Sequence, residues 1–128
     1  MNVQLEEVTA DNLQILRNLA VLYRYDLMPA FYQYIAACDL NEFGTFDEGK
    51  RTHDESSTSW DWVIGDPGKT CAFLIRADDQ LAGFAAICMP PYCHPSVSFC
   101  VQDFFVLNKF RRTGVGQQAA FMLFDRFK

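Results

Sequence analysis

The sequence predicts a single α/β (α+β) domain over residues 1–128, in which helices flank a central sheet. Three observations support this prediction. A strand-like segment and a long amphipathic segment open the chain, three strand-like segments follow a polar stretch, and a helix-compatible segment comes last. A chain of 128 residues has the length of one domain and buries roughly two-thirds of its unfolded surface. Half of its residues are hydrophobic and 15% are aromatic, so we expect a packed core and no disorder.

The first part of the chain predicts one strand and two helices. Residues 3–8 alternate loosely between apolar and polar side chains and are expected to form a strand. Thr9 is the expected N-cap of a helix over residues 10–27, where apolar side chains recur at intervals of three and four. Pro29 ends that helix or starts the next one, because proline is tolerated in a first helical turn. A second, short helix is expected over residues 31–37.

A long polar loop is expected over residues 39–69, where glycine and proline interrupt an acidic stretch. A loop of this length in a compact domain is usually functional or disordered. Residues 60–63, Trp-Asp-Trp-Val, are expected to anchor part of it. The loop makes the chain asymmetric in charge: residues 1–66 carry −8 and residues 67–128 carry +3, which together give the net charge of −5.

Three apolar runs in the second half predict three strands. Residues 71–76 and 81–89 are expected to pair through a hairpin turn at residues 77–80. The proline-rich residues 90–95 break the chain, and residues 97–107 form the next strand.

The segment after that strand has the features of a phosphate-binding loop. Residues 111–116, Arg-Arg-Thr-Gly-Val-Gly, lead into residues 117–127, which have good helix propensity. Two glycines, Gly114 and Gly116, let a ligand approach the backbone where the first helical N–H groups lack partners. Those N–H groups, the helix dipole and the two arginines all favour an anion.

Several types of glycine-rich loop compete for this assignment. A nucleotide-triphosphatase loop needs a lysine after its last glycine, and none follows Gly116. A dinucleotide-binding loop tolerates Ala119 in place of its third glycine, but it needs an acid about 20 residues further on, beyond Lys128. The pattern that remains is Arg-x-x-Gly-x-Gly. A plain turn with solvated arginines stays open as the alternative.

Residues 111–116 resemble the pyrophosphate-binding motif of the GCN5-related N-acetyltransferase (GNAT) superfamily, whose members bind acetyl-coenzyme A. The order of elements resembles the N-terminal half and core of the acyl-CoA N-acyltransferase-like fold over nearly the whole chain. This implies a mixed, mostly antiparallel central sheet flanked by helices. Residues 73–78, 83–85 and 103–106 look like those of a bacterial subgroup of uncharacterised predicted acetyltransferases.

The resemblance implies an enzyme that transfers an acetyl group from acetyl-coenzyme A to an amine of a small molecule or peptide. It assigns Asp103, the acid of the last strand, as catalytic base, although a structural or solvated carboxylate stays open. An ordinary carboxylate with a pKa of about 4 is a poor base for an amine, so burial or a relaying water is needed. The implied cofactor-binding residues are Phe104, Phe105, Val106, Arg111, Arg112, Thr113, Gly114, Val115, Gly116 and Gln117. A free N–H within residues 104–106 is expected to polarise the thioester carbonyl.

The superfamily normally continues beyond this helix with another strand, a helix and usually two more strands. We therefore interpret the sequence as truncated after the phosphate-loop helix. Residues 115–127 are apolar on most sides of the predicted helix, and the strand at residues 101–107 would present an unpaired edge. Either a longer chain or a homodimer is expected to cover both. A non-catalytic coenzyme A-binding or interaction module is the alternative function, and a structural fragment without cofactor is a third.

Composition argues against several other classes of protein. An acidic chain without a broad basic face is a poor nucleic-acid binder. We expect neither a membrane span nor a signal peptide, and so a cytoplasmic protein. Cys88, Cys93, His94 and Cys100 could supply four metal ligands, but no Cys-x2-Cys spacing is present and no metal site is expected.

Overall fold

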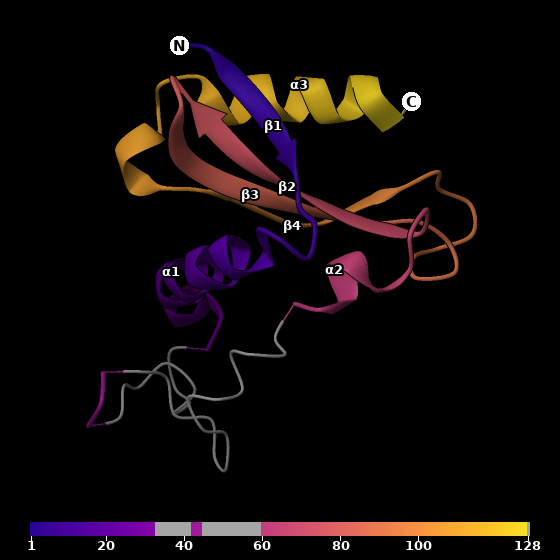
Figure 1. Ribbon diagram of the computed structural model, residues 1–128, viewed down its shortest axis with the longest axis horizontal. Helices are drawn as coiled ribbons and strands as arrows, with labels where there is room; N and C mark the ends of the chain where they lie inside the picture. Colours follow the sequence, from indigo (N-terminus) through magenta and orange to yellow (C-terminus); the bar gives the residue numbers. More distant parts are fainter. Residues whose placement is uncertain (33–41, 45–59, 128) are drawn as a thin grey trace.

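The computed structural model describes residues 1–32, 42–44 and 60–127, and it arranges them in three layers with the sheet in the middle (Figure 1). Helix α3 lies on one face of the sheet, and helices α1 and α2 lie on the other. The elements in order are β1 (Val3–Glu7), α1 (Leu13–Tyr32), α2 (Trp62–Gly65), β2 (Thr70–Ala77), β3 (Gln80–Cys88), β4 (Cys100–Val106), the short 3-10 helix η3 (Asn108–Phe110) and α3 (Val115–Phe127). Most of the expected loop at residues 39–69 lies outside the described residues.

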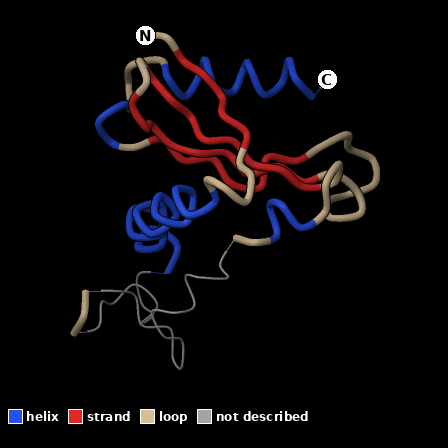
Figure 2. The backbone as a smooth tube through the Cα atoms, in the orientation of Figure 1, coloured by secondary structure: helices blue, strands red, loops and turns tan. Residues whose placement is uncertain are grey.

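The four strands form one sheet in the order β1-β2-β3-β4, and each neighbouring pair is antiparallel. Figure 2 shows this continuous layer of strands between the helices. The predicted hairpin joins β2 to β3 through Asp78 and Asp79, whose φ angles of 50° and 68° are those of a tight left-handed turn. In the described part of the chain β4 pairs only with β3, so the predicted open edge is confirmed there.

Each face of the sheet supports its own part of the core. Towards α1 and α2, Phe84 and Leu74 are fully buried against Leu16. Towards α3, Phe73 and Ile75 are equally buried, the former with Leu123. The antiparallel strands thus alternate their side chains between two apolar layers, as strand geometry requires. The sheet is therefore fixed in register by burial on both faces.

Helix α1 differs from its prediction at both ends. It begins at Leu13 because Asn12 holds a turn ahead of it: the Asn12 Oδ1 accepts the N–H of Thr9 at 2.7 Å. Thr9 therefore stabilises that turn and does not cap the helix. The helix also runs through Pro29 to Tyr32 as one element, where a break was expected. Proline has no N–H to donate to the carbonyl four residues earlier, so the helix continues through Pro29 with one main-chain hydrogen bond fewer. Residues 33–37 of the expected second helix lie outside the described residues.

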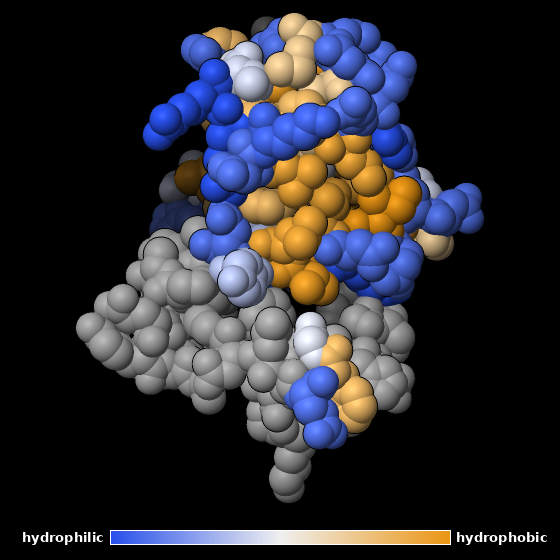
Figure 3. Space-filling view, turned by 90° about the vertical axis from the view of Figure 1, so that its left-hand side faces the viewer, coloured by the Kyte–Doolittle hydropathy of each residue, from blue (hydrophilic) through white to orange (hydrophobic). Residues whose placement is uncertain are grey.

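Helix α3 packs on the sheet through a single stripe. Val115, Ala119 and Leu123 are buried at intervals of four residues. Phe121 and Phe124 are 62% and 52% exposed. The helix is therefore apolar on more sides than the described chain covers. A separate apolar area lies below the level of α3, in the middle of the side shown in Figure 3, with hydrophilic side chains around it.

Candidate functional site

Strands β3 and β4 approach each other unusually closely at Gly83. A Cβ atom placed on Gly83 would lie 1.9 Å from the carbonyl oxygen of Phe105. Further along the pair, Ala86 is opposite Asp103 but Ile87 is opposite Val101. Gln102 is thus an extra residue in β4, which makes a β-bulge. The bulge places Gln102 and Asp103 together on the same side of the sheet, where both line a pocket.

The open edge of β4 presents main-chain hydrogen-bonding groups. Leu107 donates its N–H to the carbonyl of Ala82 at 2.7 Å, immediately after the strand. Pairing alternates along antiparallel strands, so Phe105 also faces β3, and the N–H groups of Phe104 and Val106 point away from it. These are the donors that the sequence analysis expected in residues 104–106.

The glycine-rich loop leads directly into α3 and leaves the start of that helix uncapped. Gln118 donates its N–H to the carbonyl of Gly114 at 3.0 Å, the first such bond of the helix. The amides of Val115, Gly116 and Gln117 have no recorded acceptor among the described residues. Gly114 has a φ of 90° and Arg112 a φ of 64°, both in the left-handed region. The N-terminus of α3 therefore has the free donors that an anion needs.

The side chains of the loop leave these amides open. The Thr113 hydroxyl donates to the carbonyl of Phe110. Arg111 makes an ion pair with Asp26 of α1 and donates through Nε to the carbonyl of Val106 at 2.9 Å. Arg112 is exposed. The guanidinium of Arg111 thus connects α1 to the end of β4, and its predicted contact with a phosphate stays a prediction.

The start of α3 lies over the outer end of β4. A Cβ atom on Gly116 would contact the side chains of Val106 at 3.5 Å and Phe104 at 3.8 Å. The free amides of the loop are therefore next to the open strand edge. All ten predicted cofactor-binding residues belong to this continuous region of β4, the loop and the first turn of α3.

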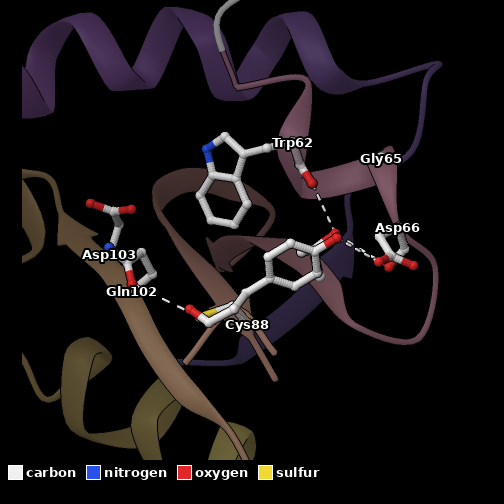
Figure 4. A pocket seen from close by; sticks show the side chains of 8 residues that line it. Trp62, Gly65, Asp66, Cys88, Gln102 and Asp103 are labelled. Carbon is white, nitrogen blue, oxygen red and sulfur yellow. Dashed lines mark hydrogen bonds between the residues drawn. The ribbon is translucent and has the colours of Figure 1, made fainter. Parts of the chain in front are cut away.

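A pocket of about 550 Å³ opens on the opposite side of the sheet, below α1 and α2. Its lining comes from distant parts of the sequence: Trp62, Gly65, Asp66, Thr70, Cys88, Tyr92, Gln102 and Asp103. Asp103 and Asp66 lie on opposite sides of this pocket, with the Trp62 ring between them in the view of Figure 4. Tyr92 donates its hydroxyl proton to Asp66 Oδ2 at 2.7 Å. The pocket is consequently lined by two carboxylates and two aromatic rings.

The pocket changes the acidity of Asp103. Its partial burial raises its pKa above the ordinary value, although a hydrogen bond from Tyr23 opposes that shift. The Tyr23 hydroxyl donates to Asp103 Oδ1 at 3.0 Å. Burial, together with the nearby Asp103, raises the pKa of Tyr23 to about 12. A carboxylate whose pKa lies above its usual range is a better proton acceptor for an amine than a solvated one.

A thiol also lines the pocket. Burial, with smaller effects from Cys100 and Cys93, raises the pKa of the Cys88 thiol to about 11. Cys88 lies opposite Cys100 in the β3–β4 pair. The described residues include no group of three or more histidine, cysteine or acidic side chains placed to hold a metal ion.

Sequence reasoning missed most of the pocket and all of its connection to α1. Tyr23 lies in α1, Asp66 lies between α2 and β2, and Tyr92 lies between β3 and β4, and no spacing in the sequence links them. Trp62 lies in the segment that was expected only to anchor the loop, and that anchoring is confirmed because Trp60 and Val63 pack against the core. A small signal for the bulge existed in the adjacent polar pair at residues 102–103 of an otherwise apolar strand.

Comparison with solved structures shows the fold to be widespread. AAC(6')-Iy, in complex with the bisubstrate analog CoA-S-monomethyl-acetylneamine, superposes with a TM-score of 0.57 at 16% identity, over 99% of this chain and 71% of that one. An integron cassette protein from the mobile metagenome of Vibrio cholerae gives 0.56 at 20% identity, over 96% and 66% of the two chains. A ribosomal-protein-alanine N-acetyltransferase from Brucella melitensis biovar Abortus gives 0.51 at 16% identity, over 98% and 72%.

Two further findings concern the sequence itself. No curated protein matches it. No helix in the described part of the chain is both long and apolar enough to cross a membrane. The model of the Acetyltransferase (GNAT) family matches residues 28–128, and the chain therefore belongs to the GNAT acetyltransferase family.

Proposed function

We propose that this protein transfers the acetyl group of acetyl-coenzyme A to an amine that enters the pocket beside Asp103. One observation carries the proposal. Strand β4 joins two sites: its open edge runs to the free amides of α3, and the side chain of Asp103, next to the bulge, lines a pocket on the other side of the sheet. A thioester donor along that edge and an amine in the pocket would meet at β4.

The cofactor side of the site fits a pyrophosphate. The uncapped amides of residues 115–117 and the helix dipole favour an anion, and Arg112 supplies an exposed positive charge. The N–H groups of Phe104 and Val106 can donate to carbonyl oxygens of an extended ligand along the strand. Apart from the charge of Arg112, these contacts would be made by main chain, which fits the two glycines of the motif.

The reaction moves one acyl group and one proton when the acceptor is a neutral amine, and an acceptor that binds as an ammonium first releases one further proton to solvent. The amine nitrogen attacks the thioester carbonyl carbon, the C–S bond breaks, and the sulfur leaves as a thiolate that must be protonated. A main-chain N–H of β4 stabilises the developing charge on the carbonyl oxygen. Asp103 accepts the proton that the amine loses, directly or through one water. Among the described residues we assign no general acid for the thiolate.

The acceptor side fits a cationic amine. Asp66 and Asp103 give the pocket negative charge, and the rings of Trp62 and Tyr92 can contact an ammonium group by cation–π interaction. AAC(6')-Iy, one of the similar structures, was solved with an analog that joins coenzyme A to an acetylneamine group. That likeness supports an amine as acceptor here and leaves its identity to experiment.

Two measurements test the proposal. Titration calorimetry with acetyl-coenzyme A should show binding, and thiol release should depend on an added amine from a panel of monoamines, diamines and peptides. Binding without thiol release from any amine would favour the alternative, a coenzyme A-binding module. No binding at millimolar ligand would remove both functions.

The predicted homodimer stays a prediction. The exposed apolar side chains Phe121, Met122 and Phe124 on α3 and the open edge of β4 are the surfaces that a second copy would cover. Sedimentation velocity at two protein concentrations tests it, because a dimer would show a concentration-dependent mass.

A further inference from the structure

We propose that Tyr23 of α1 is a positioning residue for Asp103. Its hydroxyl holds one oxygen of the Asp103 carboxylate by a hydrogen bond, so that the other oxygen faces the pocket. This inference rests on the proposed function, because it assigns Tyr23 to the same proton-transfer step. It adds a residue that lies 80 positions away in the sequence and outside the β4 segment.

The geometry fixes the Tyr23 hydroxyl at one place. Its ring packs edge-on against Phe84 and at a tilt against Phe105, with both centroid distances 5.4 Å. Phe84 is fully buried and Phe105 nearly so, which leaves the ring little freedom. The hydroxyl then donates to Asp103 Oδ1 at 3.0 Å. Tyr23 is not among the residues that line the pocket, so its contact with a ligand would pass through Asp103.

The hydrogen bond also opposes the effect of burial on the pKa of Asp103. Burial favours the neutral acid and raises its pKa, while the Tyr23 hydroxyl stabilises the carboxylate and lowers it. Tyr23, with its pKa raised to about 12, stays a proton donor throughout the neutral range. The two residues therefore keep a half-buried carboxylate available for an amine proton.

The other polar groups near Asp103 do not replace this hydrogen bond. Gln102 of β4 and Cys88 of β3 are neutral, and the two contact each other at 3.9 Å. Asp66, on the opposite wall, accepts from Tyr92. Arg111, the basic residue of the loop after β4, is paired with Asp26. Within the described residues Tyr23 is the recorded donor to the Asp103 carboxylate.

The test is the conservative variant Tyr23→Phe, which keeps the ring packing and removes the hydroxyl. We expect the pKa of Asp103 to rise by about one unit, since the stabilising donor is lost. The acid limb of the kcat/KM profile should move to higher pH by the same amount. Acceptor amines of different pKa separate this limb from the titration of the substrate.

A readout without activity comes from NMR. The carboxyl carbon of Asp103 is titrated in the wild type and in Tyr23→Phe, with Asp103→Asn to assign the signal. The matched control is Tyr92→Phe, which removes a similar hydrogen bond from the same pocket but to Asp66. It should leave the Asp103 titration unchanged.

The outcomes separate the two proposals. Unchanged titration of Asp103 in Tyr23→Phe overturns the positioning role, whatever the activity. A shifted titration without a shift in the pH profile also overturns it, because Asp103 would not be the group that limits the reaction. A wild-type protein that releases no thiol refutes the proposed function instead, and the titration then reports on the hydrogen bond alone.

A second variant keeps the proposal testable if Tyr23→Phe does not fold. Tyr23 replaced by 3-fluorotyrosine keeps the ring and hydroxyl but makes the hydroxyl more acidic and a stronger donor. The Asp103 titration and the acid limb should then move to lower pH, opposite to Tyr23→Phe. A movement in the same direction for both variants would contradict the proposal.

Discussion

The two faces of the sheet carry different kinds of chemistry. The α3 face is apolar along the helix, with Val115, Ala119 and Leu123 buried on the strands, and the groups proposed to bind the cofactor are main-chain amides at the helix start. The α1 face is apolar only in part. Beyond the core it holds a pocket whose functional groups are the side chains of Asp103, Asp66 and the aromatic residues.

This difference shows how one strand can serve two ligands. On β4 the side chains of Phe104 and Val106 belong to the α3 side, whereas Asp103 belongs to the pocket. The bulge at Gln102 places a second polar residue on the pocket side, while residues 103–106 of β4 keep their regular pairing with β3. Substitutions on the two faces should therefore separate binding of the donor from reaction with the acceptor.

The largest loss of stability is expected at the close contact between β3 and β4, because both faces of the sheet depend on it. Gly83→Ala places a Cβ atom 1.9 Å from the Phe105 carbonyl oxygen and 3.0 Å from Val106 Cα, so β3 and β4 must move apart. We expect a loss of about 3 kcal/mol in the free energy of unfolding, measured by urea denaturation. Gly65→Ala is the control, since its Cβ would meet nothing within 4 Å. Similar stability of the two variants would mean that the strands are not held at this distance.

Asp103→Asn should separate the reaction with the acceptor from binding of acetyl-coenzyme A most clearly. The amide cannot accept a proton from the amine, so kcat should fall by about 10²–10⁴-fold, while the affinity for acetyl-coenzyme A stays unchanged.

The same variant should also change how the stability of the protein depends on pH. Because the folded protein raises the pKa of Asp103, its contribution to stability is full at low pH and is lost as pH rises through the raised value. At neutral pH the variant should therefore melt at a higher temperature than the wild type. A lower melting temperature would contradict this account.

Gly114→Ala tests the cofactor loop against a matched turn elsewhere. Gly114 and Gly68 have φ angles of 90° and 88°, and neither has a neighbour within 4 Å of its Cβ direction. Alanine should cost about 1 kcal/mol of stability at either position, because both are left-handed. Only Gly114→Ala should weaken acetyl-coenzyme A binding, by about tenfold in calorimetry. Equal affinity in the two variants would remove the loop from the cofactor site.

The two arginines of the loop should give the smallest and most distinct effects. Arg112→Ala removes an exposed charge, so affinity for acetyl-coenzyme A should fall by about threefold to tenfold, less at high salt. Arg111→Ala removes contacts with Asp26 and the Val106 carbonyl and should lower stability by about 1 kcal/mol. Calorimetry and urea denaturation on both variants distinguish the roles. A greater loss of affinity for Arg111→Ala would mean that its side chain leaves Asp26 to bind the cofactor.

The sequence was sufficient for local features and insufficient for those assembled over distance. The strands, the hairpin and the α3 loop follow from periodicity, turn residues and glycine, because each is determined by neighbours in the chain. The predicted start of α1 was wrong because Thr9 and Asn12 together form a turn ahead of the helix, which begins only at Leu13. The hydrogen bond between Tyr23 and Asp103 joins residues 80 positions apart, and no local pattern encodes such a contact.

Because the Cys88 thiol is protonated at neutral pH, it is a poor acceptor for an acyl group. A thiol next to a thioester can itself take the acyl group by exchange, which would leave the protein acylated and idle. Exchange proceeds through the thiolate, and with a pKa of about 11 only about one Cys88 in ten thousand is ionised at neutral pH. Under the proposed function, the raised pKa of Cys88 would disfavour acylation of this sulfur relative to acylation of an amine.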